Sequence, residues 1–248
     1  MTTSSESKRS NMLAPVALAF AVLCALLLAL SGPGNRFGWW DFRMAFSIFN
    51  FASWAGLAAM VLSFAAGIVV ANRWNAGMAM TLAGVVLGAL TYALPVQMWA
   101  SGRAMPPIHD ITTDSANPPR FVAILPLRKG APNTAEYGGP ALAATQARAY
   151  PDIAPLTLAM PPQEVFERCL ALARREGWDI VSASSETRII EATAATAFFG
   201  FKDDVVIRVT PASGAAGSRI DMRSVSRIGR SDLGVNARRI RAFLRALS

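Results

Sequence analysis

Residues 222–243 read MRSVSRIGRSDLGVNARRIRAF and combine two different periodicities. From about residue 219 to residue 228, side chains alternate between two faces, which predicts a β-strand. One face carries Ile220, Met222, Ser224 and Ser226, and the other carries Arg219, Asp221, Arg223, Val225 and Arg227. Ser231 or Asp232 is suited to cap a helix, whose apolar stripe consists of Leu233, Ala237, Ile240, Phe243, Leu244 and Leu247. The stretch therefore predicts a strand followed by an amphipathic helix.

Similar patterns lie upstream. The segment QEVFERCLALARREG (163–177) has the apolar spacing of a helix, with Gly177 as its end. Further strands are expected at residues 178–183, 188–198 and 205–209, because turn residues separate these runs. The order helix, four strands and helix predicts an α+β fold for residues 161–248. We expect an antiparallel meander with two flanking helices on one face and polar residues on the other.

Residues 101–160 are rich in Pro, Gly and Ala and show little periodicity. The prolines favour extended backbone and forbid long helices. Residues 121–125 could add a strand, which gives a sheet of about four to five strands. Residues 129–150 are expected to form a loop with at most one helical turn. We assign the whole segment to the soluble domain, since a connection of this length is usually functional or lies over the surface.

Three apolar stretches precede this domain, at about residues 13–31, 44–70 and 78–100. Each is long enough for a helix to cross the roughly 30 Å of membrane hydrocarbon, and none contains a charged residue. The hydrophobic content of 53% and the mean hydropathy of +0.35 agree with this interpretation. Residues 13–100 are therefore predicted to form three transmembrane helices, followed by the α+β domain.

Positive charges that flank the three helices are balanced between the two sides of the membrane. Lys8 and Arg9 precede the first helix, which often dominates orientation, and they favour a cytoplasmic position for residues 1–12. Three spans then place residues 101–248 outside the cytoplasm. Residues 29–31, Ala-Leu-Ser, also resemble a signal-peptidase site. Cleavage there leaves two helices and the same domain outside, so both alternatives predict a multi-pass protein of the inner (plasma) membrane.

Few residues suit metal or cofactor chemistry. The chain contains two cysteines, Cys24 and Cys169, and one histidine, His109. This composition excludes a disulfide framework and metal sites built from several thiolates or histidines, and we expect no cofactor. The net charge of +8 favours anionic partners. Nucleic acid is not expected among them, because the chain has no helix-turn-helix, ribonucleoprotein or zinc pattern.

Three separated blocks carry a family resemblance: IHDITTDSANPPRF (108–121), FGFKDDVVIRV (199–209) and MRSVSRIGRSDLGVNARRIRAF (222–243). In this order they resemble the bacterial and plastid family called domain of unknown function 1499, over about residues 105–247. The resemblance implies a membrane-associated protein of the cell envelope with no established activity. It therefore supports localisation and domain limits, and it carries over no catalytic residue.

The arginines of residues 222–243 support two hypotheses. In the first, Arg223, Arg227 and Arg230 lie beside the start of a helix and bind an anion, because guanidinium groups and free helix amides both favour negative ligands. In the second, they pair with nearby carboxylates in a structural network. The candidate residues for either role are Lys202, Asp203, Asp204, Arg223, Arg227, Arg230, Ser231, Asp232, Arg238 and Arg239.

His109, Asp110 and Asp114 form the one stretch that resembles a set of general acid–base catalytic residues. Alternatively, the two aspartates fasten the proline-rich segment to the arginine-rich strand or helix. No nucleophile motif accompanies them. We therefore predict a non-enzymatic binding or structural module for an anionic lipid, glycan or protein partner, with a hydrolase or transferase that uses His109 as the alternative.

Overall fold

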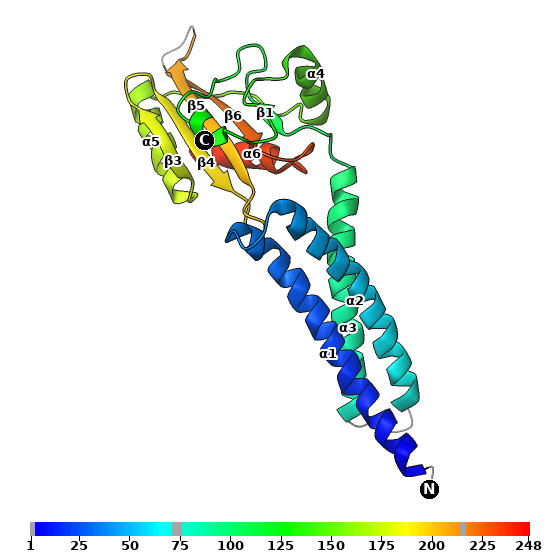
Figure 1. The fold of residues 1–248 in the computed structure, drawn as a ribbon. Coiled ribbons are helices and arrows are strands. Elements are labelled where there is room, and N and C mark those ends of the chain that lie inside the picture. Colours follow the sequence, from blue (N-terminus) through cyan, green and yellow to red (C-terminus); the bar gives the residue numbers. More distant parts are fainter. Residues whose placement is uncertain (1–2, 71–75, 214–216) are drawn as a thin grey trace. The chain divides into compact units, whose positions relative to one another are not determined.

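The computed structural model describes residues 3–70, 76–213 and 217–248, with side chains from residue 12 onward (Figure 1). Lys8 and Arg9, on which the expected orientation depends, thus lie outside the described side chains. The chain divides into two compact units. Residues 1–102 together with Phe198–Gly200 form a helical unit, and Arg103–Ala197 with Phe201–Ser248 form an α+β domain.

The helical unit contains α1 (Thr3–Arg36), α2 (Phe42–Val70) and α3 (Ala76–Arg103). All three are long and apolar enough to cross a membrane, over Met12–Arg36, Phe42–Val70 and Ala76–Arg103. The prediction of three long apolar helices is therefore confirmed. The first helix ends five residues later than expected, because it continues through Pro33 to Arg36.

Small residues allow α2 and α3 to pack closely. A Cβ added at Gly88 would lie 2.6 Å from the backbone nitrogen of Met60 and 2.7 Å from the carbonyl oxygen of Gly56. No side chain fits at such distances, so the two backbones are in direct contact. Close approach through glycine is a common way for helices to associate in lipid, where apolar side chains gain little from leaving the solvent.

Six strands form the sheet of the α+β domain: β1 (Asp110–Thr112), β2 (Leu156–Leu158), β3 (Asp179–Ser184), β4 (Ile189–Ala195), β5 (Lys202–Pro211) and β6 (Ser218–Ser226). Their order is β1-β6-β5-β4-β3, and β2 also pairs with β6. Every pair is antiparallel. The predicted four-strand meander is confirmed, but β1 and β2 enlarge the sheet beyond the four to five strands expected.

The additional strands have three residues each, which is too few for a recognisable alternation. The strand considered at residues 121–125 is wrong. This stretch forms a bend and a turn, followed by the 3₁₀ helix η1 (Leu125–Arg128). Pro126 in η1 has no backbone N–H to give to a sheet, whereas the first turn of a helix needs none.

Two helices, α5 (Pro162–Arg175) and α6 (Val235–Leu247), pack against one face of the sheet and enclose the main core. We call this face the helix face. Its core joins the apolar stripes of both helices to Val205, Ile207 and Met222. The last helix begins at Val235, after Gly234 with a φ of 75°. Leu233, expected in the apolar stripe, therefore precedes the helix and is exposed.

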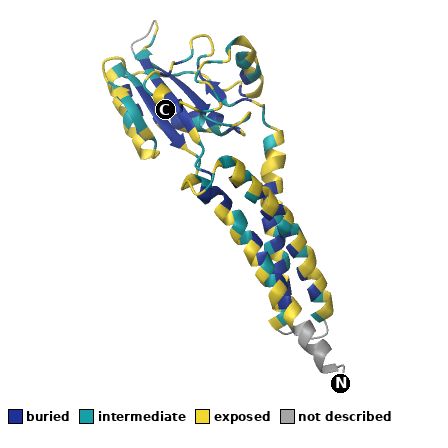
Figure 2. Cartoon of the chain, viewed as in Figure 1, coloured by how far each residue is buried: buried dark blue, intermediate teal, exposed yellow. Residues whose placement is uncertain are grey.

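The opposite face of the sheet is covered by residues 113–137, which we call the covering segment. Phe121 and Ile124 of this segment pack against Val206 and Val225 in a second, smaller core. We call this side of the sheet the loop face. Charged residues lie on it, as expected, but most of them are buried rather than solvated, and Figure 2 shows the strands as a largely buried layer.

The helix α4 (Gly139–Ala149) has eleven residues, whereas one turn was expected in this region. It carries Gln146, which is buried beside the edge strand β1. The Gln146 side chain accepts a hydrogen bond from the Thr112 amide at 3.0 Å and donates one to the Thr112 carbonyl at 2.7 Å. One side chain thus replaces a neighbouring strand and blocks further pairing at this edge.

Candidate functional site

A buried ion pair joins β1 to β6 on the loop face. Arg223 donates from Nε and Nη2 to the two carboxylate oxygens of Asp110, at 2.9 and 2.7 Å. The same guanidinium donates to the carbonyl of Ala135 at 2.8 Å and lies 5.2 and 5.4 Å from the ring centres of Phe121 and Tyr137. Arg223 therefore fixes the covering segment to the sheet by bidentate, backbone and cation–π contacts.

A second centre forms around Asp204, whose side chain is fully buried. Arg227 binds both of its oxygens, at 2.9 and 2.8 Å, and Arg128 reaches one oxygen from η1 at 2.5 Å. The Thr193 hydroxyl donates to the carboxylate at 2.8 Å. Two arginines share one carboxylate, so Asp204 connects the sheet to the part of the covering segment around Arg128.

Glu191 holds the middle of the covering segment. Its buried carboxylate accepts three backbone N–H bonds, from Val122 and Ala123 at 3.0 Å each and from Ile124 at 2.9 Å. These amides precede η1 and do not take part in the backbone hydrogen bonds of a helix or strand. A carboxylate that accepts several backbone amides stabilises a turn that would otherwise bury unsatisfied donors.

A third network lies closer to solvent. Asp114 contacts Arg208 and Arg219 at 3.4 and 3.0 Å, and Asp221 contacts the same two arginines at 3.1 Å. Asp114 also accepts the amides of residues 116 and 117. This network anchors the beginning of the covering segment, as Glu191 and Asp204 anchor its middle and end.

Within the networks just described on the loop face, five positive groups accompany five negative groups. The positive groups are Arg128, Arg208, Arg219, Arg223 and Arg227, and the negative groups are Asp110, Asp114, Glu191, Asp204 and Asp221. Leaving one such buried charge without its partner costs several kcal/mol. The acceptors for Arg223 and Arg227 thus come from the chain itself, and these arginines hold the covering segment in place.

On the helix face, Asp203 and Asp232 lie near the start of α6. Asp203 accepts a hydrogen bond from Arg239 at 2.7 Å. Asp232 accepts the backbone amides of Gly234 and Asn236, at 2.8 Å each. Burial raises the pKa of Asp232, and the charge of Asp203 adds to this effect, while the two amides oppose it. The amides at this helix start are therefore occupied by a carboxylate of the chain.

The other predicted residues are dispersed. Lys202, which precedes the strand expected at residues 205–209, begins β5 and is exposed, and Asp203 and Asp204 point to opposite faces of the sheet. Arg230 and Arg238 are exposed. The Ser231 hydroxyl donates to the Pro106 carbonyl at 3.0 Å. Arg223, Arg227 and Arg230 are thus not gathered around one ligand position.

The proposed acid–base residues do not meet either. Asp110 is held by Arg223, and Asp114 by Arg208 and Arg219. The Nδ1 atom of His109 lies 3.4 Å from the carbonyl oxygen of Arg230. Burial raises the pKa of Asp110, and the Arg223 guanidinium opposes this effect. Asp110 and Asp114 thus fasten the proline-rich segment to arginines of the sheet.

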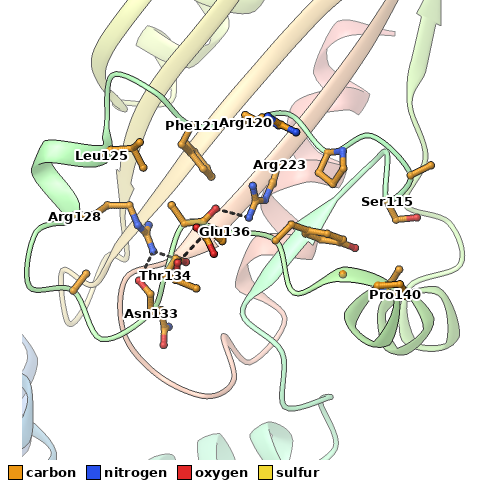
Figure 3. Close-up of a pocket in the computed structure, with 17 residues that line it drawn as sticks. Ser115, Arg120, Phe121, Leu125, Arg128, Asn133, Thr134, Glu136, Pro140 and Arg223 are labelled. Carbon is orange, nitrogen blue, oxygen red and sulfur yellow. Dashed lines mark hydrogen bonds between the residues drawn. The ribbon is translucent and has the colours of Figure 1, made fainter.

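The covering segment contains a cavity of about 1030 Å³ (Figure 3). Its walls come from residues 115–143, and its floor includes Arg223. Apolar side chains such as Phe121, Leu125 and Pro140 form much of the lining, together with Arg120 and Arg128. The volume is at the upper end of the range for sites that enclose a small molecule.

Two polar atoms in the lining lack partners. Within the described part of the chain, the Nε of Arg128 and the hydroxyl of Tyr137 are buried and make no hydrogen bond. Burial raises the pKa of Tyr137, the charge of Asp110 adds to this, and Arg223 opposes it. The hydroxyl therefore remains protonated at neutral pH and is able to donate or accept one hydrogen bond.

Sequence reasoning missed Glu191, Arg128 and the cavity. Glu191 had a usable signal, because it is the one charged residue of the apolar run 189–201, and a carboxylate inside a buried strand requires partners. Arg128 had none, since LPLRKG reads as an ordinary surface turn. The cavity depends on how residues 115–143 fold over the sheet, which no local pattern encodes.

Comparison with curated proteins finds no match. A family model for proteins of unknown function matches residues 110–247, which is more than half of the chain and includes β1, every other strand and α6. The three sequence blocks that carry the resemblance lie almost wholly within this range. The chain therefore belongs to the DUF1499 family of proteins of unknown function.

Proposed function

We propose that this protein is a membrane-anchored binding module whose ligand occupies the cavity of the covering segment. The observation that carries the proposal is the cavity itself, with its volume of about 1030 Å³ and its walls from residues 115–143. Three helices suited to cross a membrane precede the domain and give it a bilayer anchor. The buried ion pairs keep the walls of the cavity in position. A site that is already formed loses less conformational entropy when a ligand binds to it.

The residues that line the cavity favour binding rather than catalysis. The lining does not include His109, Asp110 or Asp114. Asp110 is buried, and both of its carboxylate oxygens accept hydrogen bonds from Arg223. A general base must reach its substrate within hydrogen-bond distance, and within the described chain the carboxylate of the lining residue Glu136 makes no hydrogen bond to a hydroxyl of the lining.

The ligand class follows from the lining. Apolar walls suit an acyl or other hydrophobic chain, whereas the exposed Arg120 suits a phosphate or carboxylate. The lining residues Arg128 and Tyr137 also keep one buried polar atom each, Nε and Oη, without a hydrogen-bond partner in the described chain. We therefore propose an anionic amphiphile of the envelope, a phospholipid or lipid-linked glycan, as the ligand.

Binding of dioctanoyl phosphatidylglycerol to the full chain in detergent tests this proposal, with titration calorimetry or native mass spectrometry as the readout. Ala143 of α4 lines the cavity, and its exposed neighbour Ala144 does not. Ala143→Trp is expected to weaken binding at least tenfold because the indole fills the cavity, while Ala144→Trp leaves it unchanged. Equal affinity in both variants, or no binding by the native chain, rejects the cavity as the site.

We also propose that the α+β domain lies outside the cytoplasm, at the plasma membrane. Lys8 and Arg9 precede the first candidate span, which begins at Met12, and together with the count of three spans they support this orientation. Ser185 lies at the exposed β3–β4 turn. A Ser185→Cys variant in intact cells is expected to react with a membrane-impermeant maleimide. Reaction only after the cells are permeabilised would place the domain inside.

A further inference from the structure

Large apolar side chains point outward from the covering segment. Val122, Leu125 and Leu127 are 70%, 48% and 54% exposed. In the described part of the α+β domain, Leu233 is the other large apolar side chain in this exposed class, at 37%. Three of four such side chains thus fall within six consecutive residues. A cluster of this kind marks an interaction surface more often than scattered exposed residues do.

This outward cluster belongs to a firmly held turn. Ile124, between the exposed residues, is fully buried in the second core. Glu191 binds the amides of residues 122–124. Arg227 donates to the carbonyl of Leu127 at 2.9 Å. The backbone is therefore fixed by buried charges on one side while it presents apolar side chains on the other, which is a preformed contact surface rather than a loose loop.

The charged residues that flank the cluster along the chain are positive. Arg120 and Lys129 lie on either side of it, and both are exposed. Arg128, also in this range, is paired with Asp204. Along the chain, the cluster is therefore apolar at its centre and flanked by positive charge, while the exposed Glu136 lines the cavity of the covering segment.

We propose that residues 122–127 form a membrane-docking tip, which inserts Val122, Leu125 and Leu127 among the lipids of an anionic bilayer while Arg120 and Lys129 contact the headgroups. A few apolar side chains beside basic ones match the requirements of interfacial binding. A protein partner is less well suited, because specific interfaces need about 800 Å² from each side. The three candidate spans of this chain also keep a bilayer within reach of the domain.

Leu125 of the docking tip and the flanking Arg120 also line the cavity, so the test of the docking tip uses labels at positions that do not line it and measures immersion in lipid rather than ligand binding. The full chain is reconstituted into nanodiscs with a nitroxide at Val122→Cys or Leu127→Cys, neither of which lines the cavity. Cys24 and Cys169 are buried. Burial also raises the pKa of Cys169 to about 12, which keeps this thiol protonated and unreactive. Ser185→Cys serves as the control.

In nanodiscs that contain phosphatidylglycerol, the labels at 122 and 127 are expected to become accessible to oxygen and several-fold less accessible to a water-soluble nickel complex. The label at 185 should remain accessible to nickel. Replacing Arg120 and Lys129 with Gln should return the tip to water. The proposal is overturned if labels at 122 and 127 match the control, if the double variant keeps them immersed, or if spin–spin broadening shows that a second copy covers them.

Discussion

Asp204 is a fully buried residue on which two arginines converge. It binds Arg227 from β6, Arg128 from η1 and the hydroxyl of Thr193 from β4. Its side chain has no solvent exposure. Two guanidinium groups in one buried place are stable only because this carboxylate lies between them. The planar fork of arginine allows both to bind it in defined geometry.

Asp204→Asn is therefore expected to destabilise the full chain by about 3–5 kcal/mol, since it leaves two buried positive charges without a counterion. Asp152→Asn is the matched control, because Asp152 pairs with Arg241 but is 54% exposed, and surface pairs contribute about 1 kcal/mol or less. Denaturant unfolding in detergent, followed by tryptophan fluorescence, measures both. Coincident unfolding curves for the two variants would show that Asp204 has no such role.

Asp232 gives a pH dependence of known sign. Burial raises its pKa in the folded state above 3.8, so the folded chain takes up this proton at a higher pH than the unfolded chain. Its contribution to the free energy of unfolding therefore increases as the pH falls through the folded pKa, and levels off below about 3.8. Asp232→Asn removes this contribution.

Melting temperatures of the native chain and of Asp232→Asn are compared between pH 7 and pH 4. The melting temperature of the native chain minus that of Asp232→Asn is expected to increase as the pH falls. A difference that stays constant, or that shifts in favour of Asp232→Asn at low pH, contradicts the raised pKa.

At the scale of elements, the covering segment differs from the rest of the domain. It has one short 3₁₀ helix and no strand over residues 113–137, so few backbone groups pair with each other. The conformation of the covering segment depends on four side chains that project from the sheet, those of Glu191, Arg223, Arg227 and Asp204. The walls of the cavity are thus positioned by side chains rather than by secondary structure.

Glu191→Gln tests this dependence. The amide side chain keeps an acceptor oxygen but places an N–H₂ group against one of the three backbone donors. A hydrogen bond to a charged group contributes about 1.5–3 kcal/mol, so hydrogen exchange at residues 122–124 is expected to accelerate about 10- to 100-fold. Amides of β5, such as those of Val205 and Ile207, provide the internal reference. Uniform acceleration throughout the domain would indicate global destabilisation instead.

Elements with regular patterns were predictable, and those held by tertiary contacts were not. The four-strand meander, α5, α6 and the three apolar helices follow from periodicity of side chains. In contrast, β1 exists because it pairs with β6, and Gln146 of α4 protects its edge. The charged alternation of β6 was also visible, but the partners of Arg223 and Arg227 lie about 20 to 115 residues away in sequence, beyond any local pattern.

At the scale of the whole molecule, the chain combines two units that are stabilised by different interactions. The helical unit is apolar and closely packed through glycines such as Gly88, whereas the α+β domain contains buried ion pairs on both faces of its sheet. The family match over residues 110–247 falls within the second unit, apart from Phe198–Gly200. The family match therefore lies in the α+β domain, and the three candidate membrane spans lie outside it.

Photocrosslinking in native membranes tests the central claim, a ligand-filled cavity, most directly. The full chain carries photo-leucine, whose diazirine side chain is much smaller than an indole, at Ala143, which lines the cavity, or at Ala144, which does not. After irradiation, mass spectrometry is expected to find a phospholipid or lipid-linked glycan attached at position 143 and none at position 144. Equal adducts at both positions, or none at position 143, would contradict the claim that the cavity binds an envelope amphiphile.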